Sequence, residues 1–134
     1  MIIIEIEIIF QLILATFSGA LIGLEREIKG KEAGLRTFSL VTLGSCLFTL
    51  VSLPFPGFNP AILAIGIGFL GAGVISQQSS GIVGLTTAAA LWMSAAIGAA
   101  IGLKFYLFAI FSTLLAVLIL AGFVIFEGKS FKKG

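Results

Sequence analysis

The chain has 134 residues, of which 59% are hydrophobic, and its formal net charge is only +2. It contains no histidine, no aspartate and one cysteine, which excludes Ser-His-Asp and Cys-His catalysis, imidazole metal sites and an internal disulfide. A mean hydropathy of +1.22 is typical of membrane proteins, and no basic, aromatic segment indicates nucleic-acid binding. We therefore expect one transmembrane domain over residues 1–134, with no enzymatic activity and no cofactor.

Long apolar runs predict the elements of this domain. A helix crosses the hydrocarbon core in about 20 residues, and the runs lack the alternation of a membrane β-barrel. The predicted fold class is all-α, a bundle of about five transmembrane helices packed through Gly/Ala seams. The spans lie at approximately residues 4–24, 35–53, 61–76, 84–103 and 105–126. The third is short, so it either extends into the polar segment 76–81 or that segment turns back into the protein.

Half of the charged residues lie in one block, residues 25–36, between two apolar runs. If the first helix continues past the membrane surface, Glu25 pairs with Lys29 and Glu27 with Lys31, both in the favourable i, i+4 order. The simplest interpretation of these pairs is a solvated end of the bundle that fixes its orientation in the membrane.

Three residues of this block lie directly against the apolar runs, namely Glu25, Arg26 and Arg36. Charges at that depth usually pair or bind a ligand, so we predict a functional charged cluster. It either caps the bundle as buried ion pairs or binds a ligand. In the second case Glu25 meets a cation or proton, and the arginines meet a carboxylate or phosphate. Carboxylates can also hold hydrated Mg²⁺; Glu25 and Glu27 are the candidate ligands, although their spacing specifies no metal site.

The basic residues are divided unequally between the two ends of the predicted bundle. With five spans, residues 25–36 and the tail after Phe126 lie on one side and hold every basic residue except Lys104. The positive-inside rule therefore predicts a cytoplasmic C-terminus and an N-terminus outside. Because the chain begins with Glu5 and Glu7 rather than a basic segment, its first span is expected to remain in the membrane and not to be cleaved.

Small residues recur at four-residue spacing in three spans, which lets helix backbones approach closely. The rows are Ala15-Gly19-Gly23, Ala64-Gly68-Ala72-Ser76 and Ala90-Ser94-Gly98-Gly102. Helix packing within the chain is predicted at Gly19, Gly23, Gly68, Gly71, Gly73 and Gly98. A homodimer interface built from the same rows is the alternative.

The fourth span carries polar groups among its small residues. The hydroxyls of Thr86 and Thr87 are expected to bond to helical carbonyls, although a translocation path would use the same groups. Trp92 is too deep for an interface anchor, so we expect its indole N–H to face the bundle and find an acceptor. Cys46 lies in an apolar run and is expected to be a small buried hydrophobe.

Four motifs occur in order along the chain: Gly19-Ala-Leu-Ile-Gly-Leu-Glu-Arg26, Ala33-Gly-Leu-Arg-Thr37, Gly66-Ile-Gly-Phe-Leu-Gly-Ala-Gly-Val-Ile75 and Gly84-Leu-Thr-Thr-Ala-Ala-Ala-Leu-Trp92. Together they resemble the membrane domain of the MgtC/SapB family, over nearly the whole chain. The resemblance implies a multi-pass protein of the bacterial inner membrane. It also implies an association with magnesium homeostasis and, in some members, with survival inside host cells and virulence.

The chain departs from the family pattern at two places. Many members carry basic residues between the third and fourth spans, whereas here Val83 precedes Gly84 and the stretch is uncharged, so a positively charged ligand-binding loop is not expected. Many members also carry a soluble C-terminal domain, and this chain is expected to be a short form without it.

The expected function is that of a regulatory or accessory membrane protein linked to magnesium homeostasis. It would act through helix–helix contacts and the cytoplasmic charged cluster. Its expected partners are the lipid bilayer and either a second copy of itself or another integral membrane protein. The alternative is a transporter or channel for Mg²⁺ or another small ion.

Overall fold

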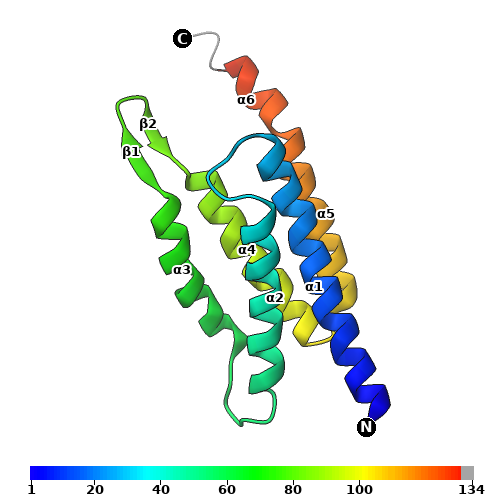
Figure 1. Ribbon diagram of the computed structural model, residues 1–134. Helices are drawn as coiled ribbons and strands as arrows, with labels where there is room; N and C mark the ends of the chain where they lie inside the picture. The colour runs from blue at the N-terminus through cyan, green and yellow to red at the C-terminus, as the bar shows by residue number, and fades with distance from the viewer. Residues whose placement is uncertain (131–134) are drawn as a thin grey trace.

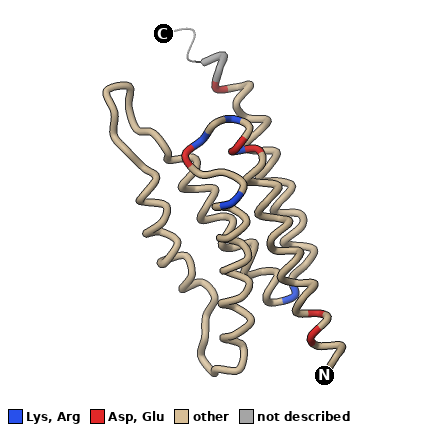
Figure 2. The backbone as a smooth tube through the Cα atoms, viewed as in Figure 1, with Lys and Arg blue, Asp and Glu red and all other residues tan. Residues whose placement is uncertain are grey.

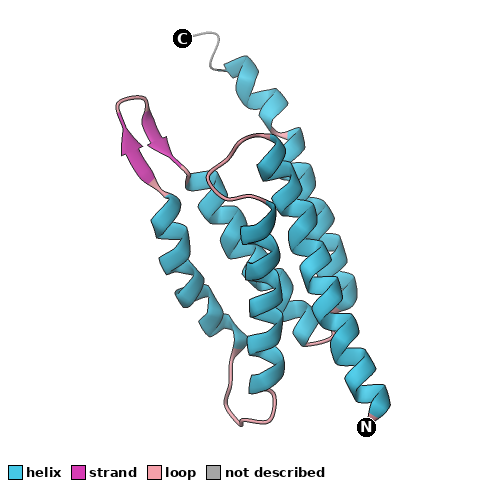
Figure 3. Cartoon of the chain, viewed as in Figure 1, coloured by secondary structure: helices cyan, strands magenta, loops and turns pink. Residues whose placement is uncertain are grey.

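The computed structural model describes residues 1–130 and is almost entirely helical (Figures 1 and 3). Its helices are α1 (Ile2–Ile28), α2 (Leu35–Ser52), α3 (Leu63–Val74), α4 (Leu85–Gly102), α5 (Tyr106–Gly122) and α6 (Val124–Ser130), with a 3₁₀ turn at Pro60–Ile62. Two short antiparallel strands, β1 (Ser76–Gln78) and β2 (Gly81–Val83), form a hairpin between α3 and α4. The predicted all-α class is confirmed.

Within residues 1–130, four helical segments are long and apolar enough to cross a bilayer, namely α1, α2, α4 and α5 with its continuation to Glu127. They correspond to the first, second, fourth and fifth predicted spans. The third predicted span contains a shorter apolar helix, Pro60–Val74. The polar segment 76–81 neither extends α3 nor turns back into the protein, because it forms the exposed hairpin that continues away from the end of α3 (Figure 3).

Helices α1 to α5 run alternately in opposite directions and α6 continues from α5, so the N-terminus lies at one end of the bundle and α6 at the other (Figure 1). Helices α1, α2 and α4 pack against one another, α5 lies against α1 and α4, and α3 packs chiefly on α4. The loop after α1 and the hairpin share the end at which α6 lies.

Charged residues gather at the two ends of the bundle and leave its length uncharged (Figure 2). The 25–36 block occupies one end, and at the other end Lys104 pairs with Glu7 at 2.9 Å. The orientation prediction also rests on three lysines near the C-terminus. The structure does not describe the side chain of Lys129, nor Lys132 and Lys133. Which end faces the cytoplasm stays a prediction.

Two of the three small-residue rows lie in tight helix–helix contacts. A Cβ added at Gly19 would collide with the Thr42 hydroxyl of α2, and one added at Gly98 would collide with the carbonyl oxygen of the same threonine. At Gly23 an added Cβ would lie 2.8 Å from the Cα of Leu35. The absence of side chains at these positions therefore lets both α1 and α4 approach the backbone of α2, as in the predicted seams.

The third row, on α3, does not form a seam within the chain. Gly68 and Gly73 are exposed, and a Cβ at either would meet no atom within 4 Å. Gly71 is buried, and a Cβ there would make an ordinary contact with Ala88 of α4 at 3.5 Å. Intrachain packing is therefore absent at Gly68 and Gly73, because α3 rests on α4 through the face that carries Gly71.

A glutamine that the sequence analysis did not single out joins α1 to the end of α4. Gln11, only 1% exposed, donates from Nε2 to the carbonyl oxygens of Ile101 and Gly102, at 2.8 and 3.2 Å. The last carbonyls of a helix lack intrahelical donors, so this side chain satisfies the C-terminal end of α4. Cys46 is fully buried beside it and donates from Sγ to the Gln11 carbonyl at 3.8 Å.

Candidate functional site

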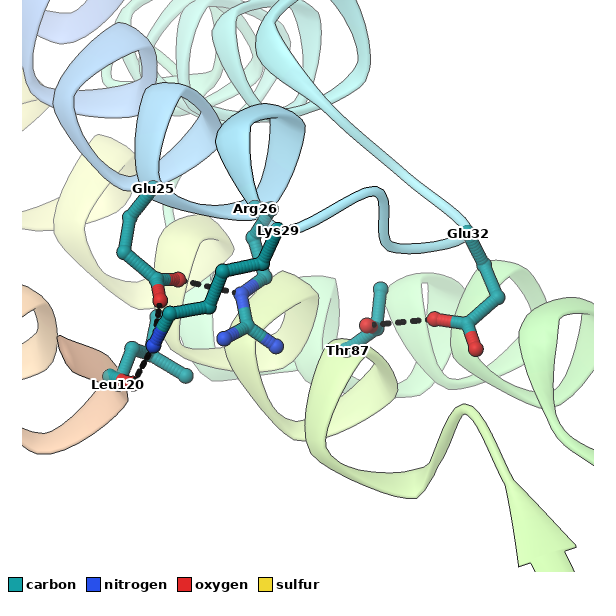
Figure 4. A network of polar contacts seen from close by, with 6 residues as sticks. All are labelled: Glu25, Arg26, Lys29, Glu32, Thr87 and Leu120. Atoms are coloured by element: carbon teal, nitrogen blue, oxygen red, sulfur yellow. Dashed lines mark hydrogen bonds and ion pairs between the residues drawn. The ribbon is translucent and has the colours of Figure 1, made fainter. Parts of the chain in front are cut away.

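A buried ion-pair cluster lies at the end of α1, which continues past the first predicted span to Ile28. The Nε of Arg26 donates to Glu25 Oε2 at 2.6 Å, and Lys29 Nζ lies 2.6 Å from Glu25 Oε1 (Figure 4). The side chains of Arg26 and Glu25 are only 3% and 9% exposed. The Glu25–Lys29 pair expected from the four-residue spacing is present, so one carboxylate is held between two cations.

Lys29 also connects this cluster to α5. Its Nζ donates to the carbonyl oxygen of Leu120 at 2.9 Å, in the last turn of α5. A cation is favoured at a helix C-terminus because the last carbonyls have no intrahelical donor. The interpretation of Lys29 as part of a solvated end is therefore too simple, because its helical position places it beside Glu25 and over α5.

Arg36 does not join the cluster, in contrast to the prediction. It is exposed in the first turn of α2 and forms no ion pair within residues 1–130. The predicted Glu27–Lys31 pair is also absent, because the helix ends before Gly30 and Lys31 no longer lies one turn beyond Glu27. The Glu27 carboxylate instead accepts the backbone N–H of Leu35 at 3.0 Å, at the start of α2.

The two candidate metal ligands are engaged separately. The Glu25 carboxylate contacts two cations, whereas that of Glu27 accepts a backbone N–H of α2. No group of three or more His, Cys, Asp or Glu side chains is placed to hold a metal ion in the described part of the chain. The geometry therefore does not bring Glu25 and Glu27 together as ligands of one ion.

A pocket of 280 Å³ lies between the charged block, the end of the hairpin and the start of α4. Its lining residues are Arg26, Lys31, Glu32, Ile82, Val83, Gly84, Leu85, Thr86 and Thr87. It brings together two predicted groups that are far apart in the sequence, the end of the first span and the start of the fourth. We call it the charged-end pocket.

One hydrogen bond ties the loop to α4 across this pocket. The Thr87 hydroxyl, 1% exposed, donates to Glu32 Oε2 at 2.8 Å (Figure 4). Thr87 was expected to bond within its helix, but the loop brings a stronger, charged acceptor to it. The backbone N–H of Glu32 and then the Thr87 hydroxyl hold the pKa of Glu32 below its usual value. Thr86, by contrast, is exposed at the pocket rim.

A glycine fixes where α4 begins. Gly84 is the residue before the first turn of α4 and has φ +89, a left-handed conformation that disfavours residues with a side chain. A Cβ there would also collide with the carbonyl oxygen of Val74 at the end of α3. Only glycine therefore allows the returning strand β2 to pass the end of α3 and close one wall of the charged-end pocket.

Trp92 does not face the bundle interior, in contrast to the prediction. Its side chain is 57% exposed and lines a 370 Å³ groove between α3 and α4. It forms no hydrogen bond within residues 1–130. The inner face of α4 is occupied by Ala90 and Ser94, both buried. A residue two positions from each of them lies about 200° around the helix, on the outer side.

An apolar groove of 520 Å³ separates α2 from α3. It is lined by Thr37, Leu40, Val41, Gly44, Ser45, Phe48, Leu63, Gly66, Ile67 and Leu70. It exists because α3 packs chiefly on α4 and leaves the facing side of α2 uncovered. A Cβ at Gly44 or Gly66 would meet no atom within 4 Å, so both walls leave space beside their backbone. We call it the α2–α3 groove.

Comparison with known proteins gives matches along most of the chain. The model of the MgtC family matches residues 12–128. The protein named "Putative magnesium transporter YhiD" of Escherichia coli K12 is 42% identical over 130 residues, which cover 87% of this chain and 60% of that protein. "Protein SrpB" of Synechococcus elongatus is 42% identical over 133 residues, covering 85% of this chain and 73% of its own length.

A further relative, "Protein MgtC" of Salmonella typhimurium LT2, is 48% identical over 99 residues, covering 71% of this chain and 43% of its own length. The chain thus spans about 60% of the length of YhiD and less of MgtC. No solved structure matches it.

Proposed function

Because the chain belongs to the MgtC family, we propose that it is a regulatory or accessory membrane protein linked to magnesium homeostasis. It acts by binding another integral membrane protein through its helices, and it has neither a catalytic role nor a cofactor. It lies in the bacterial inner membrane with the 25–36 block in the cytoplasm. The observation that carries the proposal is the α2–α3 groove.

The α2–α3 groove has the features that a partner helix needs. Lipid tails are as apolar as the groove, so association depends on close packing, which small residues permit. Gly44 on one wall and Gly66 on the other provide such positions, and neither is filled from within the chain. The rest of the lining is mainly aliphatic, so a partner helix would enter without burying a charge.

The buried hydroxyls of α2 and α4 also favour a binding role over conduction. Thr42 donates to the Phe38 carbonyl at 2.9 Å, and Ser94 donates to the Ala90 carbonyl at 2.8 Å. These two hydroxyls are therefore bonded within their own helices, and the buried Ser45 hydroxyl of α2 donates to the Ala95 carbonyl of α4, so each of the three already has a protein acceptor. The tight contacts of Gly19 and Gly98 with α2 leave no space for a hydrated ion between these helices.

Filling the α2–α3 groove tests the proposal. Gly66→Leu places a bulky side chain in the groove, and Gly73→Leu is its matched control, because Gly73 is an exposed glycine of the same helix outside the groove. Both are expressed in a bacterium that lacks its own family member, and growth is followed across a magnesium series. We expect Gly66→Leu to lose complementation and Gly73→Leu to retain it, at equal amounts of protein in the membrane. Full complementation by Gly66→Leu would contradict the proposal.

Ion transport is the second candidate function, favoured by the name of the relative YhiD. The two functions are separated by Mg²⁺ and proton flux into liposomes that contain the purified chain. Under the first proposal, flux does not exceed that of empty liposomes. Flux that disappears in Glu25→Gln would instead support a transporter with its gate at the ion-pair cluster.

A further inference from the structure

The first turn of α4 presents unpaired donors to the charged-end pocket. The first backbone hydrogen bond of this helix runs from the Ala88 N–H to the Gly84 carbonyl at 2.9 Å. The N–H groups of Leu85, Thr86 and Thr87 come before it in the chain and therefore have no acceptor within the helix. Gly84, at the capping position, has no side chain with which to accept them. Free N–H groups and the helix dipole together favour an anion at such an end. All three residues line the pocket.

Arg26 adds a second, independent set of donors. Its side chain is only 3% exposed, yet only its Nε is bonded, to Glu25. Its two terminal nitrogens have no partner within residues 1–130 and point away from Glu25 (Figure 4). A guanidinium has five N–H donors. The terminal nitrogens of Arg26 are not enclosed by protein atoms, so they are accessible from the pocket. Glu25 thus fixes the orientation of the guanidinium, and four N–H donors remain for a ligand in the pocket.

The other two charged side chains of the pocket act in opposite directions. Lys31 contributes a cation at the rim and forms no ion pair within residues 1–130. The carboxylate of Glu32 already accepts the Thr87 hydroxyl at the start of α4. Glu32 therefore occupies part of the space that favours an anion, and its negative charge would repel a second one.

We propose that the charged-end pocket binds a phosphate group, either of an anionic lipid headgroup or of free phosphate. The donors are the terminal nitrogens of Arg26, the ammonium of Lys31 and the first N–H groups of α4. They come from three separate segments, which suits the several oxygens of a phosphate better than the two of a carboxylate. Glu32 competes with the ligand for the helix end. This site is separate from the α2–α3 groove and does not depend on what that groove binds.

The test uses the full chain and two probes. Inorganic phosphate is titrated calorimetrically into protein in an uncharged detergent, at an ionic strength of about 0.15 M, which screens exposed charges beyond about 8 Å. Retention of phosphatidylglycerol over phosphatidylcholine is measured by native mass spectrometry after release from mixed nanodiscs. Removing Arg26 would leave Glu25 short of a partner and endanger folding, so the variants are Lys31→Gln and Glu32→Gln. The matched control is Arg36→Gln, an exposed cation of the same end outside the pocket.

We expect Lys31→Gln to weaken binding of the active probe about 5-fold or more and Glu32→Gln to tighten it about 3-fold. Arg36→Gln should change it less than about 2-fold. Phosphate binding assigns the site to the free anion, and phosphatidylglycerol retention without phosphate binding assigns it to a lipid headgroup. Folded wild-type protein that binds neither probe would overturn the proposal. So would equal weakening by Lys31→Gln and Arg36→Gln, because the effect would then be a general attraction of the basic end.

Discussion

Glycine serves opposite purposes in two parts of the bundle. Where α1, α2 and α4 meet, Gly19 and Gly98 allow backbone contact, and even one added carbon would collide with α2. On α3, Gly66, Gly68 and Gly73 have nothing within 4 Å of an added carbon. We call these parts the closed side and the arm, the arm being α3 with its hairpin. Glycine spacing therefore indicates where another helix can approach the backbone closely. It does not indicate whether a helix of the same chain lies there.

The strongest test of this comparison places the same substitution on both parts. Gly98→Ala should destabilise the chain by about 3 kcal/mol, because the added methyl meets the Thr42 carbonyl in a well-packed interface. Gly68→Ala should cost nothing and can add up to about 1 kcal/mol of helix propensity. Thermal unfolding in one detergent, followed by circular dichroism, measures both. Equal melting temperatures would remove the distinction between the closed side and the arm.

The connection between the arm and the closed side should be the next most sensitive position. Gly84→Ala puts a side chain on a left-handed residue, which costs about 1–2 kcal/mol, and it adds a collision with the Val74 carbonyl. Gly81→Ala is the matched control, since Gly81 also has positive φ, at +120, but no neighbour within 4 Å. Hydrogen exchange should show faster opening of α3 in Gly84→Ala than in Gly81→Ala. The opposite order would show that the collision with α3 is unimportant.

Removing a polar side chain from the closed side should lower the free energy of unfolding by a smaller amount. Gln11→Leu removes the donor to the Ile101 and Gly102 carbonyls and should cost about 1 kcal/mol, the usual size for hydrogen bonds between membrane helices. Gln77→Leu, in the exposed hairpin, should leave the unfolding free energy unchanged. Chemical denaturation of both variants measures the difference. A larger cost for Gln77→Leu than for Gln11→Leu would contradict the assignment of the stabilising hydrogen bonds to Gln11.

The smallest expected change in stability comes from removing the hydrogen bond between Glu32 of the loop and Thr87 of α4. Because the pKa of Glu32 is lowered in the folded chain, its bond to Thr87 stabilises the chain at neutral pH. That contribution is lost as the pH falls below the usual 4.5 and through the lowered pKa. The melting temperature of the wild type should therefore exceed that of Thr87→Val at pH 7, and the gap should narrow on acidification. A gap that is constant with pH would indicate that the hydroxyl acts without Glu32.

Hydropathy alone predicted where four long apolar helices lie, because the bilayer imposes a minimum length on apolar helices. The third predicted span contains only the shorter helix Pro60–Val74. Hydropathy could not predict that residues 76–83 form a hairpin, since neither strand has an apolar face to bury. The sequence also predicted that the charged residues lie at the two ends of the bundle. It did not predict which charged side chains pair with one another within one end.

The 25–36 block shows why the site was harder to predict than the fold. Arg36 and Lys29 are both basic and both near the bilayer surface, yet only Lys29 lies on the helical face that carries Glu25. The point at which α1 ends decides this, and it also separates Lys31 from Glu27. The hydrogen bond between Glu32 and Thr87 joins segments far apart in the sequence, so no local sequence pattern predicts it. Gln11 could have been noticed, because an amide within an apolar span needs a partner.

The burial of Cys46 has a practical consequence for locating the chain in its membrane. As the only cysteine, fully enclosed beside Gln11, it should not react with an impermeant maleimide while the chain is folded. Gln78→Cys would then add a single reactive thiol on the exposed hairpin. Labelling intact cells and opened cells would reveal which compartment the hairpin enters. Since the hairpin and α6 lie at one end of the bundle and the N-terminus at the other, that one result would orient both the N-terminus and α6.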